Sequence, residues 1–131
     1  LDFFVSDVGI LSTLVDFKYS DLDSMPGNTE LRLKHGEVVK VETISLNDVM
    51  DKKFNGIAPS YVSIDTEGSE YEILHSFNFE KYRPIVFTIE HNYSQLENKI
   101  DEIMKSNRYK RVFKKLTAFD AWYVCSDTIN Y

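Results

Sequence analysis

The sequence predicts an α/β protein with a largely parallel sheet, covering helices and an antiparallel hairpin at one edge. Three observations support this fold class. Strand and helix patterns alternate from residue 38 to residue 106, as is typical of parallel strands joined by helical crossovers. The segment 85–90 is short, apolar and rich in β-branched residues, like a strand buried on both faces. Two strand-like segments, one within 105–115 and one at 119–125, then follow each other directly, which predicts the hairpin.

Composition indicates one packed domain over residues 1–131. Hydrophobic residues make up 43% of the chain and aromatic residues 14%, which favours a globule over a disordered chain. The net charge of −6 argues against a nucleic-acid partner, because such proteins usually need a positive field to attract phosphates.

Cysteine usage and hydropathy suggest the setting of the protein. Cys125 is the only cysteine, so neither an intramolecular disulfide nor a cysteine-based zinc site can form, and a reducing, cytoplasmic location is expected. No apolar run reaches the roughly 18 residues that span a bilayer, and no basic region followed by an apolar stretch opens the chain. We therefore expect no membrane partner and no secretory signal.

The first 37 residues are expected to form an edge strand and an excursion. Residues 1–6 are already strand-like and no initiator Met precedes them, which suggests a chain truncated at its N-terminus. Residues 7–36 are dense in turn formers and predict a hairpin or an excursion at the sheet edge. The α/β core would then occupy residues 38–131.

The core begins with a half-exposed strand at 37–44, where apolar and polar residues alternate. Three Ser-x-x-acid patterns then predict capping boxes, in which a Ser hydroxyl and an acidic side chain satisfy backbone N–H groups at a helix start. The helices would begin at Ser45, at Ser69 after a strand at 61–64, and at Ser94 after the strand at 85–90. The basic run within 105–115 is interpreted as an exposed edge strand that lysines protect from further pairing.

Polar residues at the ends of two predicted strands form the candidate site. Glu70 and Glu72 are explained by the first turn of a helix, where its dipole favours negative charge. Asp65 and Glu67 precede that helix, at the carboxyl end of a strand, where open α/β sheets bind ligands. Gly68 allows the sharp turn between strand and helix.

The second strand ends in Glu90, His91 and Asn92. A carboxylate, an imidazole and an amide at this position could hold a substrate hydroxyl and take its proton. Alternatively, Glu90 and His91 hydrogen-bond only each other and the next loop. The residues leave both interpretations open.

Three segments, in this order, resemble the FkbM-type S-adenosylmethionine-dependent methyltransferases. The motif Asp65-x-Glu67-Gly68-x-Glu70 is similar to the D-x-E-G-x-E signature of that family. Residues 41–48 are similar to its preceding strand-to-helix segment, and residues 84–91 to its next strand, which ends in an acid and often a histidine. Ser69 and Ser76 depart from the Ala and Gly that are common in the family, and neither is an acidic position.

The resemblance implies a class I, Rossmann-like methyltransferase fold with S-adenosylmethionine as its cofactor. That fold binds its cofactor chiefly through a glycine-rich turn after the first strand and an acid after the second. The five glycines here are isolated, so we expect the C-terminal part of the domain, inactive alone and without the glycine-rich cofactor motif.

The resemblance further implies methyl transfer to a hydroxyl of a small molecule such as a carbohydrate. His91 or Asp65 would be the base and Glu90 would orient His91, which makes Asp65, Glu90 and His91 the catalytic candidates. Glu67 would position the substrate or stabilise the sulfonium. Asn92 would bind substrate, Asp65 and Gly68 would contact the cofactor, and no residue is assigned to a metal.

Two other functions fit the carboxylates. The chain could be a non-catalytic binding or assembly module whose acidic turn holds a cation or a basic residue of a partner. Glu67 and Glu90 could also be the paired carboxylates of a glycoside hydrolase. Exposed sheet edges would in addition make an oligomer possible.

Overall fold

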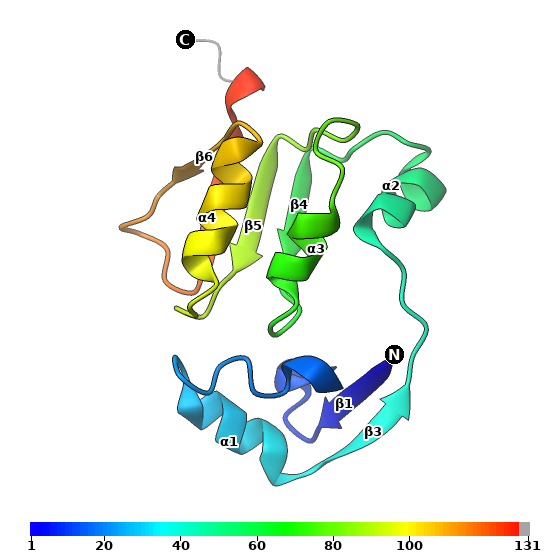
Figure 1. Ribbon diagram of the computed structural model, residues 1–131, viewed down its shortest axis with the longest axis vertical. Helices are drawn as coiled ribbons and strands as arrows, with labels where there is room; N and C mark the ends of the chain where they lie inside the picture. The colour runs from blue at the N-terminus through cyan, green and yellow to red at the C-terminus, as the bar shows by residue number, and fades with distance from the viewer. Residues whose placement is uncertain (129–131) are drawn as a thin grey trace.

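The structure, a computed structural model that describes residues 1–128, is a mixed α/β protein (Figure 1). Its strands form two sheets, a three-stranded sheet of order β2-β1-β3 and a four-stranded sheet of order β4-β5-β7-β6. The carboxyl ends of β4 and β5 point toward the first sheet and α1 in Figure 1. This junction between the two sheets is where the candidate site lies.

The first sheet is antiparallel throughout. It contains β1 (Asp2–Ser6), β2 (Thr13–Leu14) and β3 (Gly36–Lys40), and Phe3 on the central strand pairs with Leu14 and Val39. The 3-10 helices η1 (Gly9–Leu11) and η2 (Val15–Phe17) and the helix α1 (Pro26–Lys34) connect these strands. Sequence reasoning did not predict α1, because the segment is rich in turn formers, although Pro at a first helical position is a known helix-start signal.

Two strands were assigned to the wrong sheet. The strand at residues 1–6 was expected at the edge of the parallel sheet, but it is the central strand, β1, of the first sheet. The strand expected at 37–44 also belongs to the first sheet. It spans Gly36–Lys40 and pairs with β1, so it does not join the parallel sheet. Its apolar–polar alternation predicted a strand correctly, but not a half-exposed one: four of its five residues are exposed and only Val39 is partly buried. Such alternation also does not identify the partner strand. Residues 41–45 then connect the first sheet to α2 (Leu46–Phe54).

The second sheet is not largely parallel, as was expected, but combines one parallel pair with the expected hairpin. The strand β4 (Tyr61–Ile64) runs parallel to β5 (Val86–Glu90), and β7 (Asp120–Cys125) lies antiparallel between β5 and β6 (Tyr109–Val112). The hairpin β6–β7 at one edge is confirmed. The short η3 (Ser126–Thr128) follows β7.

The helices α3 (Glu70–Ser76) and α4 (Glu97–Ser106) lie over one face of this sheet (Figure 1). Val62, Ile64, Phe87 and Ile89 are buried in the core with residues of these helices. Because successive side chains of a strand point to opposite faces, Asp65 and Glu90 continue the face turned away from the helices.

Of the three serines expected to cap helices, only Ser45 does so. Ser45 Oγ accepts a hydrogen bond from the Asp48 N–H at 3.0 Å. Ser69 makes no capping bond, and its hydroxyl donates to Thr66 Oγ1 at 2.8 Å. Ser94 Oγ accepts from the Leu96 N–H, just before α4 begins.

No helix within residues 1–128 is both long and apolar enough to cross a membrane.

Candidate functional site

Three carboxylates converge where β4 and β5 end. Asp65 follows β4, Glu67 lies in the next turn and Glu90 is the last residue of β5. An oxygen of each lies within 4.8 Å of an oxygen of the other two. The carboxyl ends of parallel strands meet at one edge of a sheet, as the sequence analysis assumed. Such a group of oxygens can attract a cation, including a divalent metal ion.

The turn that carries this cluster is fixed by Glu70. Its buried carboxylate accepts hydrogen bonds from the Thr66 N–H at 2.7 Å, the Thr66 hydroxyl at 2.8 Å and the Gly68 N–H at 3.1 Å. Glu70 therefore has a structural role, but through these hydrogen bonds to the preceding turn, which the expected effect of the helix dipole did not include. The Gly68 N–H is engaged within the protein.

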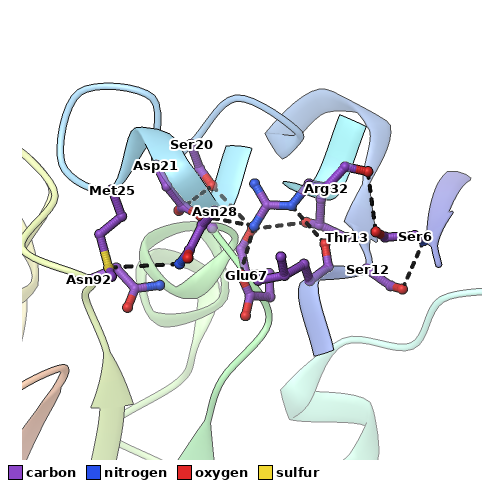
Figure 2. A network of polar contacts seen from close by, with 12 residues as sticks. Ser6, Ser12, Thr13, Ser20, Asp21, Met25, Asn28, Arg32, Glu67 and Asn92 are labelled. Carbon is purple, nitrogen blue, oxygen red and sulfur yellow. Dashed lines mark hydrogen bonds and ion pairs between the residues drawn. The ribbon is translucent and has the colours of Figure 1, made fainter. Parts of the chain in front are cut away.

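Glu67 adopts a backbone conformation that non-glycine residues rarely adopt. Its φ is 56°, in the left-handed region, and its carbonyl accepts hydrogen bonds from Thr13 Oγ1 at 2.9 Å and Ser20 Oγ at 3.2 Å. Its side chain forms an ion pair of 2.6 Å with Arg32 of α1, and Figure 2 shows these contacts. The first sheet and its connections thus hold a residue of the acidic cluster.

The protonation of the cluster is uneven. Burial raises the pKa of Glu67 to about 6, with Arg32 opposing the rise. Burial, with the nearby charges of Glu67, Asp65 and Glu70, raises the pKa of Glu90 to about 8. Asn92 Nδ2 donates to Glu90 Oε1 at 2.8 Å. At pH 7 Glu67 is therefore ionised, whereas Glu90 holds a proton.

His91 points away from this cluster. Its Nδ1 accepts from the Tyr93 N–H at 3.0 Å, and its Nε2 lies 3.3 Å from Arg111 Nη2, which places the ring beside α4 and β6. The expected contact between Glu90 and His91 is absent from the part of the chain that the structure describes. Consecutive residues at a strand end face opposite sides, which separates the two side chains. Burial lowers the pKa of His91, and the charge of Arg111 adds to this effect.

A cleft of about 740 Å³ opens beside Asp65. This volume falls within the range of small-molecule sites. The first sheet, the connection before α2 and the helix α3 form its walls, which include Phe3, Leu14, Phe17, Ile44, Ser69 and Ile73. A second cavity of about 20 Å³ touches Glu90, His91 and Asn92 and has room for about one water molecule.

Sequence reasoning did not identify the residues that hold Glu67. Thr13, Ser20 and Asp21 belong to the segment interpreted as an excursion, and Arg32 lies on the helix that was not predicted. The contacts of Thr13, Ser20 and Arg32 with Glu67 span 35 to 54 positions in the sequence. A local pattern cannot reveal pairings over such separations.

Together, these observations describe an α/β protein with a cluster of three carboxylates at the carboxyl ends of two adjacent parallel strands. The family model of the methyltransferase FkbM domain matches residues 3–111. The chain therefore belongs to the FkbM methyltransferase family, as its motifs predicted. The match includes the first sheet as well as the acidic cluster. Searches of curated proteins and of solved structures find no match.

Proposed function

We propose that this chain forms the acidic side of the active site of an O-methyltransferase, which transfers a methyl group from S-adenosylmethionine to a hydroxyl. One observation carries the proposal: Asp65, Glu67 and Glu90 converge, and Asp65 also lines a cleft of small-molecule size. Membership of a methyltransferase family supports the type of reaction.

The carboxylates fit a sulfonium cofactor in charge, and the cleft beside Asp65 is large enough for a small molecule. Carboxylates stabilise a neighbouring positive charge, and Asp65 and the ionised Glu67 would supply it here. The five glycines of the sequence are isolated, so the support in this chain comes from its carboxylates and its cleft. Among the cofactor candidates, Asp65 faces the cleft, whereas the N–H of Gly68 is bonded to Glu70.

When bound, S-adenosylmethionine would supply an electrophilic methyl group to the acceptor oxygen. The electrons of the broken carbon–sulfur bond would stay on the sulfur. Asp65 would accept the hydroxyl proton, because it is the exposed carboxylate that lines the cleft. Glu67 would add negative charge next to Asp65, whereas Glu90 and Asn92 line the separate cavity of about 20 Å³. His91, which faces α4 and β6, is not the base in this proposal.

The acceptor is proposed to be a small molecule with a hydroxyl group. The cleft has apolar walls, including Phe3, Leu14 and Phe17, with Thr66 and Ser69 beside Asp65. Such a surface favours an acceptor that is partly apolar over one that is polar on every side, such as a simple sugar.

Isothermal titration of S-adenosylmethionine into the protein tests this proposal. We expect binding by the wild type and an affinity at least about tenfold lower for Asp65→Asn, because a carboxylate next to the sulfonium is lost. Asp7→Asn removes an exposed carboxylate outside the cleft and serves as the matched control. Equal affinities of wild type and Asp65→Asn would contradict the assignment.

A parallel titration with Mg²⁺ or Ca²⁺ addresses the alternative of a non-catalytic cation-binding module. The same three carboxylates would hold the ion. Binding of the metal, without binding of S-adenosylmethionine, would favour the module over the methyltransferase.

A further inference from the structure

Arg32 connects the first sheet to the acidic cluster. Its side chain is fully buried on α1, and its guanidinium donates to acceptors in four separate segments. Three of them lie in its own part of the chain: Leu11 O at 2.6 Å, Lys18 O at 3.2 Å and Asp21 Oδ2 at 2.9 Å. The fourth is Glu67 Oε2 at 2.6 Å, beyond the end of β4 (Figure 2).

The charges around this guanidinium do not balance. Arg32 is one cation between two carboxylates, Asp21 and Glu67. Glu67 also faces Asp65 and Glu90 at the strand ends. Ser20 donates to Asp21 at 3.0 Å and to the carbonyl of Glu67 at 3.2 Å, so both acidic residues belong to one hydrogen-bonded network.

The conformation of Glu67 is maintained from outside its own turn. A non-glycine residue at a φ of 56° is strained, and such strain persists where the surroundings fix the residue. Thr13, Ser20 and Arg32 all bind Glu67, and all three belong to the N-terminal 40 residues. A segment that sequence reasoning placed at the periphery therefore shapes the centre of the site.

We propose that Arg32 is a positioning residue that fixes the Glu67 side chain beside Asp65 through the Arg32–Glu67 ion pair. This inference shares one assumption with the proposed function, which is that the acidic cluster is the active site. Arg32 itself, being buried, does not contact a ligand in this role. Without Arg32, Glu67 would lie beside the carboxylates of Asp21 and Asp65 and would lose its ion pair.

The test is the titration of the Glu67 carboxyl group, followed by carbon-13 NMR without any cofactor. The wild-type group is expected to titrate near pH 6. Arg32→Gln should raise this midpoint by about one pH unit or more, because a neighbouring cation normally lowers a carboxyl pKa by that amount. Arg32→Lys, which retains the charge, should restore part of the difference, and Arg108→Gln, at an exposed position on the far edge, should leave the midpoint unchanged.

Asp21→Asn keeps the inference testable if Arg32→Gln does not fold. Asp21 competes for the same guanidinium and its charge raises the pKa of Glu67, so its neutralisation should lower the midpoint. A purely structural role of Arg32, limited to the carbonyls of Leu11 and Lys18, predicts an unchanged midpoint in both Arg32→Gln and Arg32→Lys. That result would overturn the inference.

The two proposals fail separately. If the Glu67 midpoint moves as expected but S-adenosylmethionine does not bind, the proposed function is wrong and the role of Arg32 stands. If the cofactor binds and the midpoint is insensitive to Arg32 and Asp21, only the positioning role is wrong.

Discussion

The carboxylate of Glu70 accepts a hydrogen bond from the backbone N–H of Thr66 at 2.7 Å, and so ties the first turn of α3 to the residue after Asp65. The same carboxylate binds the Thr66 hydroxyl and the Gly68 N–H, and Glu70 is only 5% exposed. Glu70 thus holds the acidic turn from the side of α3, while the N-terminal part of the chain holds Glu67 from the other side.

Replacing Glu70 by Ala should therefore destabilise the protein strongly. The change leaves partly buried donors of Thr66 and Gly68 without this acceptor, which should lower the free energy of unfolding by about 2–4 kcal/mol. Glu70→Gln keeps one acceptor oxygen and should cost less. Urea denaturation measures both, and Glu72→Ala, an exposed position in the same helical turn, should cost below about 1 kcal/mol. Equal losses at positions 70 and 72 would contradict this account.

Gly68→Ala tests the close contact between the turn and the first part of the chain. Gly68 has a φ of 121°, and an added Cβ would lie 2.5 Å from Ser20 Oγ and 3.1 Å from Phe17 Cβ. We expect a loss of at least about 2 kcal/mol, from strain and from displacement of Ser20. Gly27→Ala is the matched control, since a Cβ there meets nothing within 4 Å and Ala favours the helix. If thermal denaturation showed the Gly27→Ala variant to be less stable than the Gly68→Ala variant, the prediction would be refuted.

The second sheet was largely predictable because its signals are local. The short apolar strands, the helices between them and the final hairpin each follow from residues close in sequence, and so does the position of Asp65 and Glu90 at the strand ends. The capping at Ser45 was predictable for the same reason. At position 69 the pattern was equally good, but the Glu70 carboxylate binds donors of the preceding turn, and no capping bond forms.

The rest of the site depends on pairings that local patterns do not encode. The partner of β3 is β1, with paired residues 30 or more positions apart, and the partner of Glu67 is Arg32, 35 residues earlier. The orientation of His91 was also missed, although strand periodicity alone places it opposite Glu90. Applying that periodicity past the strand end would have separated the two residues.

The confirmed cap of α2 allows a sharper test of its energy. Ser45→Ala removes the acceptor of the Asp48 N–H and should lower the free energy of unfolding by about 1 kcal/mol. Ser45→Asp supplies another capping oxygen and should recover most of that loss. If the Ser45→Asp variant were no more stable than the Ser45→Ala variant in urea denaturation, the cap would not be the source of the effect.

Glu90→Gln should stabilise the protein at high pH and much less at low pH. The pKa of Glu90 is raised to about 8 by burial and by Glu67, Asp65 and Glu70, whereas a glutamate in the unfolded chain titrates near its ordinary value of 4.5. A raised carboxyl pKa means that ionisation is harder in the native state, so stability is lost as the pH rises from about 4.5 to about 8. Gln mimics the protonated form, and its side-chain oxygen can still accept from Asn92.

The difference in the free energy of unfolding between Glu90→Gln and the wild type is therefore expected to grow between pH 5 and pH 9, by on the order of 1–3 kcal/mol. Urea denaturation at both pH values measures it. Glu102→Gln, at an exposed position on α4, should show a nearly constant difference over the same range. If the difference in unfolding free energy for Glu90→Gln were also constant, Glu90 would not interact with Asp65 and Glu67 at the end of β4. The three carboxylates would then not act as a single site.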